Sequence, residues 1–496
     1  MKLIRSKNIL SHQQWIVISI LLLSFLLRAI LIFRGGQFYF SDEGRYQISR
    51  NAAEFMLKGN FRDALAQLIM TPEHLGFKII GLVPAMAENI LGASRILPAL
   101  FFSLFSVLNL YLIYKLSQRA GAPFHESVLA LLLATASHSL LYYARHLMPY
   151  DMAMSLGLLA LYVGLAEKAT IKTSITCGIL ALFCFVTYNG YWSLAGFAMA
   201  VHILKGSRIN FELVHRALRT ALGFTIPLGL LFALFRVSGT NLFSEYSKFA
   251  KTIDQGSYTE GWSLPFEYFW HSEHASILIL SGLSLWAIVN LFRSKKKYAR
   301  VWVAGLTVIY LCLLIPSMFL HSFVVYGRLA RQILPFIILL AATGLTDIEQ
   351  HSKPFIKWLF LAAILFQGVW NFTTSYRLSY PREFVAQIQA DFHDFEFSTK
   401  RLAFGAPFVC QNNGYVIENV KYFLTPPETI PQIKGELLRS AFHPVNFLPY
   451  QYEGYTPDQR QGFRRQEIRM EFYQVGNAFE ANPLQSSIKN CMVNEK

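Results

Sequence analysis

The segment that decides the fold is Phe40–Arg50, FSDEGRYQISR, which follows a long apolar run. That run, Gln14–Phe33, is long enough to cross a bilayer, because a helical span needs about 20 apolar residues. Two adjacent carboxylates, Asp42 and Glu43, are therefore predicted to lie just outside a membrane, with basic and aromatic residues close behind them. Carboxylates serve as bases or metal ligands, and arginine binds phosphate through its planar guanidinium. The segment indicates chemistry on a phosphate-bearing lipid.

A second interpretation of the same segment is structural. Ser41 or Asp42 then caps a helix in a solvated loop, and Glu43 lies in the positively polarised first turn. The segment alone does not separate the two interpretations, so the rest of the chain has to be considered.

The composition indicates a polytopic α-helical membrane protein. The chain has 496 residues, of which 53% are hydrophobic and 15% are charged, whereas soluble domains carry about 25% charged residues. The net charge of +15 does not indicate a nucleic-acid partner, because the basic residues stand at the ends of apolar runs rather than in one patch. The amino terminus lacks a small-residue cleavage site, so the first apolar run is expected to stay as a helix.

The apolar runs predict about eleven spans. Basic residues cluster at alternate ends of the runs, which places the amino terminus in the cytoplasm and the carboxyl terminus outside an inner or plasma membrane. Two long outer loops result, residues 34–94 and 238–274. The predicted spans are Gln14–Phe33, Arg95–Leu116, Ser127–Tyr143, Tyr150–Ala166, Thr173–Thr187, Tyr191–Leu204, Thr220–Val237, Ala275–Phe292, Val301–Leu320, Arg331–Leu345 and Trp358–Trp370.

The first outer loop has helical patterns of its own. Tyr46–Lys58 is compatible with a helix on the membrane surface, and Phe77–Leu91 with a second such helix or a short span. A span there would turn the later basic clusters outward, so the surface helix is favoured.

The composition changes at about Asn371, and residues 371–496 read as an extracytoplasmic α+β domain, separate from a transmembrane module of residues 1–370. We expect strands at Arg401–Val409 and Ile468–Val475 and a helix at Pro381–Phe392. Two of the five cysteines, Cys410 and Cys491, fall in this part. An oxidising compartment would let them form a disulfide.

The run Asp42–Arg50 resembles the first-loop signature of membrane glycosyltransferases with the C-type (GT-C) fold. It is most similar to the group that uses polyprenyl-phosphate sugars, which includes protein mannosyltransferases and the lipid A aminoarabinose transferase. The latter has a similar Asp-Glu-x-Arg-Tyr-x-x-Ile-Ser-Arg run, and here one residue fewer separates Tyr46 from Ile48.

Four more landmarks carry the resemblance. Glu73–Phe77 is similar to the family's second-loop element, although the prolines of that element are missing, and Ser94–Leu100 looks like the start of its second helix. Pro149–Asp151 resembles the Pro-Asp element that opens the fourth helix, and Tyr326–Pro335 resembles the Arg-Tyr-Leu-Leu-Pro entry of a late helix.

The resemblance implies a hexosyl- or pentosyltransferase that takes a sugar from a polyprenyl-phosphate carrier and passes it to a hydroxyl acceptor on a lipid, glycan or protein. It gives Asp42, with Glu43, the catalytic role of activating the acceptor hydroxyl, or of positioning it with help from a metal ion. It places Arg45 and Tyr46 near the carrier phosphate, whose developing negative charge they would stabilise. Other candidates for the site, each with a structural alternative, are the following: Arg145 and Asp151, paired with each other or bound to substrate; Arg328 and Arg331, on the phosphate or as interfacial anchors; Glu73 and His74, as ligands of a divalent metal ion or as lining of the loop; and His271–His274, as a metal site or an interfacial cluster.

Two other functions compete with this one. A transporter or flippase of lipid-linked sugars keeps polar residues on broken helices at the bilayer midplane and often has two related halves. Here the informative carboxylates lie in outer loops and the halves do not look alike. A non-catalytic assembly subunit leaves the Asp42–Arg50 cluster without a purpose, so the transferase is the leading hypothesis.

Overall fold

The computed structural model describes residues 12–33, 41–70, 72–94, 96–205, 211–237, 241–247, 264–291, 296–319, 327–351 and 354–374, together with six strands between residues 402 and 480. A helix lies at each predicted span. The helices at these positions are α1 (His12–Phe33), α5 (Ile96–Ala120), α6 (Phe124–Ala136) with α7 (His138–Tyr142), α8 (Tyr150–Gly164), α9 (Ile171–Thr187), α10 (Trp192–Leu204), α11 (Phe211–Val237), α14 (Ala275–Leu291), α15 (Arg300–Phe319), α17 (Leu334–His351) and α18 (Pro354–Thr374).

The apolar helices make this chain an integral membrane protein. Five of the helices in the described part of the chain are long and apolar enough to cross a membrane, or six if the bent pair α6–α7 counts as one span. Shorter apolar helices include α8, α9 and α14. The total of about eleven spans therefore stays a prediction.

One predicted span is broken. The run Ser127–Tyr143 was expected to form a single helix, but the chain bends by 63° between α6 and α7. Ser137 takes an extended conformation there, and its hydroxyl accepts from the backbone N–H of Leu140. Glu273 accepts from the backbone N–H groups of His138 and Ser139 at 3.0 and 2.8 Å, so the break leaves these donors satisfied.

Helices pack closely where glycine removes the side chain. Gly178 of α9 faces the backbone of α11 at Thr220, and Gly223 of α11 faces the backbone of α9 at Ile175. A Cβ at either glycine would overlap the facing carbonyl oxygen. Small residues at contacts of this kind let membrane helices approach closely, since lipid tails provide no hydrophobic drive for helix association.

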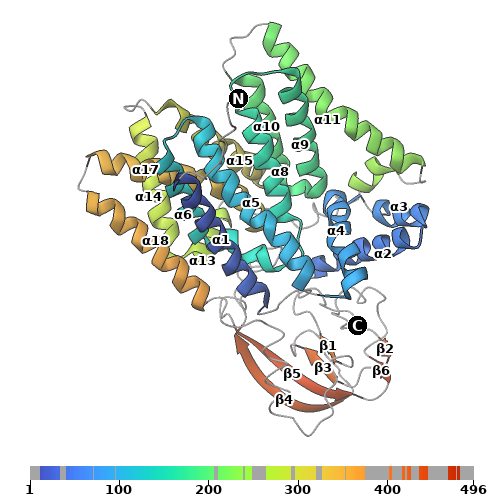
Figure 1. Ribbon diagram of the computed structural model, residues 1–496. Helices are drawn as coiled ribbons and strands as arrows, with labels where there is room; N and C mark the ends of the chain where they lie inside the picture. Colours follow the sequence, from blue (N-terminus) through green and yellow to red (C-terminus); the bar gives the residue numbers. More distant parts are fainter. Residues whose placement is uncertain are drawn as a thin grey trace, which may run out of the picture.

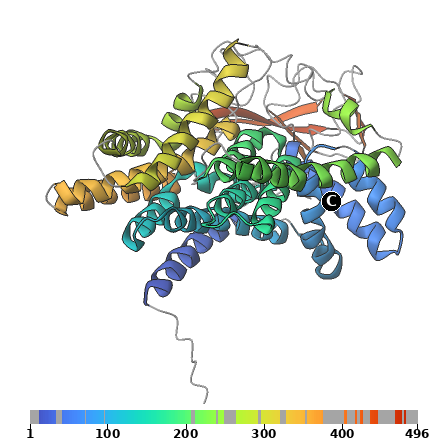
Figure 2. The same cartoon turned by 90° about the horizontal axis from the view of Figure 1, so that it is seen from above.

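The first outer loop folds as predicted into helices. The short 3-10 helix η1 (Ser41–Arg45) leads into α2 (Tyr46–Leu57), which is followed by α3 (Phe61–Ile69) and α4 (Leu75–Leu91). In Figures 1 and 2, α2 and α3 lie at one side of the helical part and α18 at the opposite side. The remaining helical segments are the 3-10 helices η2 (Tyr143–Arg145), η3 (Asn189–Tyr191), η4 (Lys297–Ala299) and η5 (Arg331–Ile333), with α13 (Leu264–Glu273) and α16 (Gly327–Ala330).

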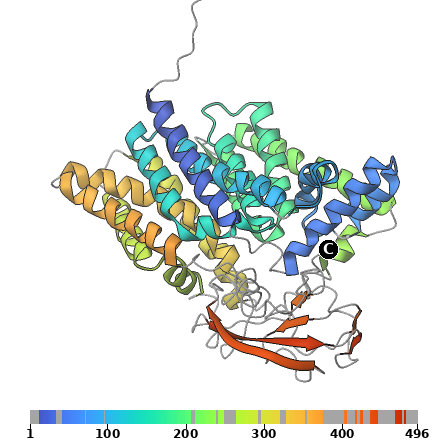
Figure 3. The ribbon, with the colours of Figure 1, turned by 60° about the horizontal axis from the view of Figure 1, so that its bottom comes forward.

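Strands follow in the carboxyl-terminal part. A four-stranded sheet has the order β1 (Leu402–Phe404), β3 (Tyr422–Thr425), β5 (Glu467–Val475) and β4 (Gly435–Pro444), and β2 (Val416–Glu418) pairs with β6 (Ala478–Glu480). β1 and β3 are parallel and the other pairs antiparallel. Figures 1 and 3 show the strands beyond the end of the helical part at which α1 finishes.

The predicted strand Ile468–Val475 is confirmed as β5, and β1 covers Leu402–Phe404 of the predicted strand Arg401–Val409. The predicted helix Pro381–Phe392 and the predicted disulfide Cys410–Cys491 lie outside the described residues. The division into residues 1–370 and 371–496 stays a prediction, and α18 itself runs on to Thr374.

Candidate functional site

Four segments far apart in the chain meet at the end of the bundle where α1 finishes. They are η1, the turn from η2 into α8, the turn between α9 and α10, and α16 with η5. Because successive helices run in opposite directions, every second connection between them lies at this end of the bundle. Most of the site residues predicted from the sequence are in these segments.

Glu43 of η1 is buried against the turn before α8. Its side chain is 0% exposed, and its Oε1 accepts from the backbone N–H of Leu147 at 2.7 Å. Its Oε2 lies 3.5 Å from Nδ1 of His146. The interpretation of this segment as a solvated loop was therefore wrong for Glu43, whereas capping by Ser41 or Asp42 stays a prediction. Asp42 is part of η1.

Arg145 completes this contact from the other side. Its Nε donates to Nε2 of His146 at 3.2 Å, and its guanidinium lies 5.7 Å from the ring centre of Tyr142. Burial lowers the pKa of His146, which Glu43 opposes and Arg145 reinforces. The imidazole is thus kept neutral at pH 7.

Asp151 and Arg331 form a buried ion pair. Nη2 of Arg331 lies 2.7 Å from Oδ1 of Asp151, and the guanidinium lies 4.5 Å from the ring centre of Tyr143. The expected pairing of Asp151 with Arg145 was wrong, because Arg331 holds the carboxylate. Arg331 is 0% exposed, so the expectation of an interfacial anchor was also wrong. Its Nε and Nη1 have no hydrogen-bond partner among the residues that the structure describes.

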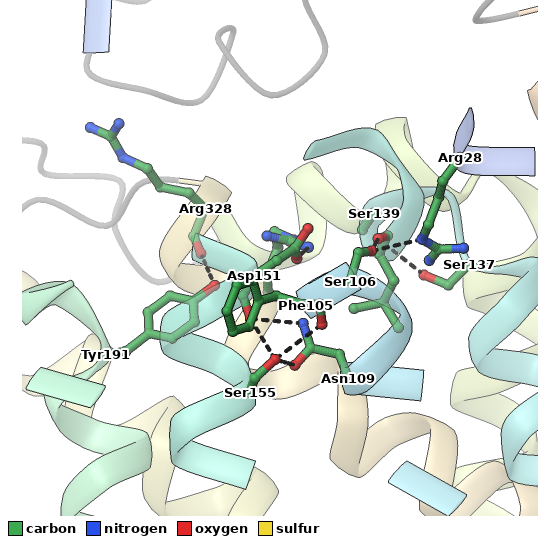
Figure 4. Close-up of polar contacts among 12 residues, drawn as sticks. Arg28, Phe105, Ser106, Asn109, Ser137, Ser139, Asp151, Ser155, Tyr191 and Arg328 are labelled. Carbon is green, nitrogen blue, oxygen red and sulfur yellow. Dashed lines mark hydrogen bonds and ion pairs between the residues drawn. The ribbon is translucent and has the colours of Figure 1, made fainter. Parts of the chain in front are cut away.

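Hydrogen bonds with a residue of α5 and within α8 itself hold the start of α8 in place. Asn109 donates to the backbone oxygen of Asp151 at 3.0 Å, and the hydroxyl of Ser155 donates to Oδ1 of Asn109 at 2.8 Å. Figure 4 shows these contacts next to the hydrogen bond that Nε of Arg28, on α1, donates to the Ser106 hydroxyl. A buried polar network thus holds the backbone of α8 at Asp151, and with it the position from which the carboxylate extends.

Arg328 lies beside the same tyrosines. Its Nη1 bonds to the hydroxyl of Tyr150, its guanidinium lies 5.4 Å from the centre of that ring, and its side chain is partly exposed. The hydroxyl of Tyr191 donates to the backbone oxygen of Arg328 at 3.1 Å (Figure 4). Gln332, fully buried, accepts from Ser193 and donates to the backbone oxygen of Gly190, which joins η5 to the α9–α10 turn.

The ring of His74 contacts the tyrosines of the site by aromatic stacking. The residue has a left-handed backbone (φ 53°), its Nδ1 donates to the backbone oxygen of Thr187, and its ring stacks on Tyr188 at 5.3 Å. Tyr188 in turn packs edge-on against Tyr150 at 4.8 Å. His74 is thus a buried part of the wall of the site.

The predicted metal ligands do not form a ligand set. Glu73 is next to His74 in the chain, but within the described ranges no group of three or more His, Cys, Asp or Glu side chains gathers. These residues therefore do not fit a metal site, and the metal ion stays a prediction from the resemblance.

A buried lysine lies near Glu73 and Arg45. Lys78 of α4 is 0% exposed. Burial lowers the pKa of its ammonium group to about 8, with Glu73 opposing the shift and Arg45 adding to it. Burial raises the pKa of Tyr246 to about 12, and the negative charge of Glu73 adds to this rise. Both outer loops therefore contribute charged or polar groups around Glu73.

Tyr46 and Arg50 are tied to Glu88. The Tyr46 hydroxyl donates to Glu88 at 2.8 Å, and Arg50 makes a two-pronged contact with the same carboxylate at 2.9 and 2.7 Å. Burial, followed by the bond to Glu88, raises the pKa of the Tyr46 phenol. This cluster joins α2 to α4, which is a structural use of two residues of the Asp42–Arg50 run.

Glu273, in the outer cluster His271–His274, caps the break before α7. It accepts from the Ser137 hydroxyl at 2.7 Å in addition to the two backbone N–H groups described above. Its carboxylate is thus fully engaged within the fold, which the sequence did not indicate.

The comparisons with known proteins give a likeness to solved structures alone. No family model matches the chain, and no curated protein matches it. Among solved structures, the chain is similar to the archaeal oligosaccharyltransferase AglB from Archaeoglobus fulgidus, determined in complex with an inhibitory peptide and a dolichol-phosphate. The sequences are 10% identical, the match covers 83% of this chain and 69% of that chain, and the TM-score is 0.48. A likeness of this size assigns neither family nor function, so the proposals below depend on the site itself.

Proposed function

We propose that this protein transfers a sugar from a polyprenyl-phosphate carrier to a hydroxyl acceptor at the outer face of the membrane. The observation that supports this most is the Arg331 guanidinium, which is fully buried and has two nitrogens without a hydrogen-bond partner in the described part of the chain. A buried donor without an acceptor costs about 1–3 kcal/mol, and more when it is charged. An anionic group of a ligand would satisfy these donors.

The balance of charge at the site also favours an anion. Four arginines of the proposed site, Arg45, Arg145, Arg328 and Arg331, bring permanent positive charges, against the three carboxylates of Asp42, Glu43 and Asp151. Of these carboxylates, those of Glu43 and Asp151 are already bonded within the fold. Guanidinium groups bind phosphate oxygens in pairs and stabilise the negative charge that develops on a leaving phosphate.

The aromatic side chains suit the rest of such a donor. Tyr143, Tyr150, Tyr188 and Tyr191 pack edge to face around the arginines, with ring centres between 4.8 and 5.4 Å apart. Rings that are apolar on the face and polar at the hydroxyl accommodate an amphipathic lipid headgroup.

Within this proposal each group has a role. Asp42 accepts the proton of the acceptor hydroxyl, Arg45 and Arg328 bind the carrier phosphate, and Arg331 stabilises its charge from the buried side. Arg145 either helps these arginines to bind the phosphate or acts indirectly, by holding His146 in position. No step uses a metal ion.

The direct test is release of polyprenyl phosphate from labelled donors. Purified full-length protein in lipid vesicles would be given a panel of polyprenyl-phosphate sugars, each labelled in the sugar, with a mixed detergent extract of membrane lipids and glycans as the acceptor source. We expect release with at least one donor, and no release with any donor would overturn the proposal.

A transporter of lipid-linked sugars is the second candidate, because the break between α6 and α7 is of the kind that transporters use. In transporters the freed half-helix end meets the substrate. Here the carboxylate of Glu273 already accepts from His138 and Ser139 at that end. The break therefore favours the transferase over the transporter.

A further inference from the structure

An acidic side chain of the first outer loop contacts the α7–α8 turn. Oε1 of Glu43 accepts from the backbone N–H of Leu147, and Oε2 faces Nδ1 of His146. Glu43, His146 and Leu147 are each at most 2% exposed. The contact joins positions 104 residues apart in the chain.

The tautomer of His146 is set by its other neighbour. Nε of Arg145 can only donate, so Nε2 of His146 accepts that bond. The proton of the neutral imidazole is then on Nδ1, where it faces the Glu43 carboxylate. One oxygen of Glu43 thus accepts a hydrogen bond from the backbone of this turn, and the other makes an electrostatic contact of 3.5 Å with Nδ1 of His146.

We propose that Glu43 and His146 are positioning residues that hold η1, and with it the backbone of Asp42, against the turn that carries Arg145. This departs from the catalytic role that the resemblance gives to Glu43. The carboxylate faces the fold and its nearest partners belong to the protein. The catalytic consequence rests on the proposed function, whereas the docking itself does not.

The experiment measures docking without any substrate. Gly44 is exposed, and a Cβ added there has nothing within 4 Å. A nitroxide spin label on Gly44→Cys, in full-length protein with its native cysteines replaced by serine or alanine, therefore reports the mobility of η1. The protein is kept in lipid nanodiscs, and the line shape is recorded at pH 7.5.

Glu43→Gln should mobilise the label. The substitution removes the negative charge that faces Nδ1 of His146, and it replaces one of the two carboxylate oxygens by an NH2 group, which cannot accept from the backbone N–H of Leu147. His146→Leu should mobilise it as well, whereas His146→Gln, which keeps an N–H donor, should restore most of the order. The double variant Glu43→Gln/His146→Leu should be no more mobile than the more mobile single variant, because both remove the same contact.

Glu54→Gln is the matched control. Glu54 lies on α2 of the same loop and pairs with Lys58 at the surface, so its loss should leave the line shape unchanged. An unchanged line shape in Glu43→Gln, or equal mobilisation in Glu54→Gln, overturns the positioning role.

Transfer assays separate this inference from the proposed function. If Glu43→Gln abolishes sugar release without mobilising the label, Glu43 is itself catalytic and the inference is wrong. If the label responds as expected but the wild type releases no sugar from any donor, the proposed function fails and the docking stands. With both correct, His146→Gln should recover kcat in step with label order, since kcat depends on where Asp42 is held.

Discussion

At the residue scale, the proposed chemistry depends on Asp42. Asp42→Asn should lower sugar transfer by about 100-fold or more, because asparagine neither accepts a proton nor carries a negative charge. Asparagine is also a good helix cap, so a merely structural Asp42 would tolerate the change. The measurement is initial rate of polyprenyl phosphate release. Asp63→Asn, an exposed position in the same loop, is the control and should keep the wild-type rate.

The buried pair Asp151–Arg331 gives a prediction on stability. Asp151→Asn leaves the guanidinium without its charged partner, so we expect a loss of about 3–5 kcal/mol in the free energy of unfolding. Replacing both residues, as in Asp151→Leu/Arg331→Met, should cost less than the sum of the single changes. Unfolding in mixed micelles would measure this. Glu54→Gln, which breaks the exposed contact with Lys58, should cost less than about 1 kcal/mol.

Lys78 makes stability depend on pH. Its pKa is about 8 in the folded protein and 10.5 for an unperturbed lysine, so between these values the unfolded chain binds more protons. Stability therefore rises with pH from about 8 to 10.5 and is lowest where the buried ammonium is charged. Lys78→Met should flatten this rise in thermal unfolding profiles. A slope unchanged by that substitution would assign the dependence to another group.

At the scale of elements, helix contacts depend on small residues. Gly178→Leu should strongly destabilise the protein, because the new side chain meets the backbone of Thr220 and forces α9 away from α11. Gly229→Ala on α11 is the matched control, since a Cβ there has nothing within 4 Å. It should be neutral or stabilising by about 0.5–1 kcal/mol, the usual gain of alanine over glycine in a helix. The measurement is the thermal unfolding midpoint of both variants and of the wild type in detergent.

The sequence predicts elements well and their contacts poorly. Apolar runs are local, so the positions of α1, α5 and α8 could be predicted within a few residues. The break before α7 could not, because it is stabilised by Glu273, more than 130 residues further along the chain. The pairing of Asp151 with Arg331, separated by 180 residues, was missed for the same reason. The family-like motifs identified which residues to consider, but not that Glu43 faces inward.

At the scale of the whole molecule, the two ends of the bundle differ in charge. The end with the candidate site carries Glu43, Asp151 and the arginines that contact the tyrosines. The opposite end carries basic residues at nearly every helix terminus, among them Arg119, Lys168, Lys172, Arg216 and Arg300. Ion pairs of Lys296 with Asp347 at 2.7 Å and with Glu126 at 3.4 Å close this opposite end between α6, η4 and α17.

This asymmetry predicts the orientation in the membrane, because loops rich in lysine and arginine stay in the cytoplasm. The candidate site then faces outward, where lipid-linked donors would have to be presented. Lys168→Cys tests this, since Lys168 is exposed, whereas Lys296 is a poor choice because its ion pairs would be lost. In intact cells, with native cysteines replaced, an impermeant maleimide should label Gly44→Cys and leave Lys168→Cys unlabelled until the membrane is opened. Labelling of Lys168→Cys from outside would reverse the orientation and place the site in the cytoplasm, where a donor carried on the outer leaflet could not reach it.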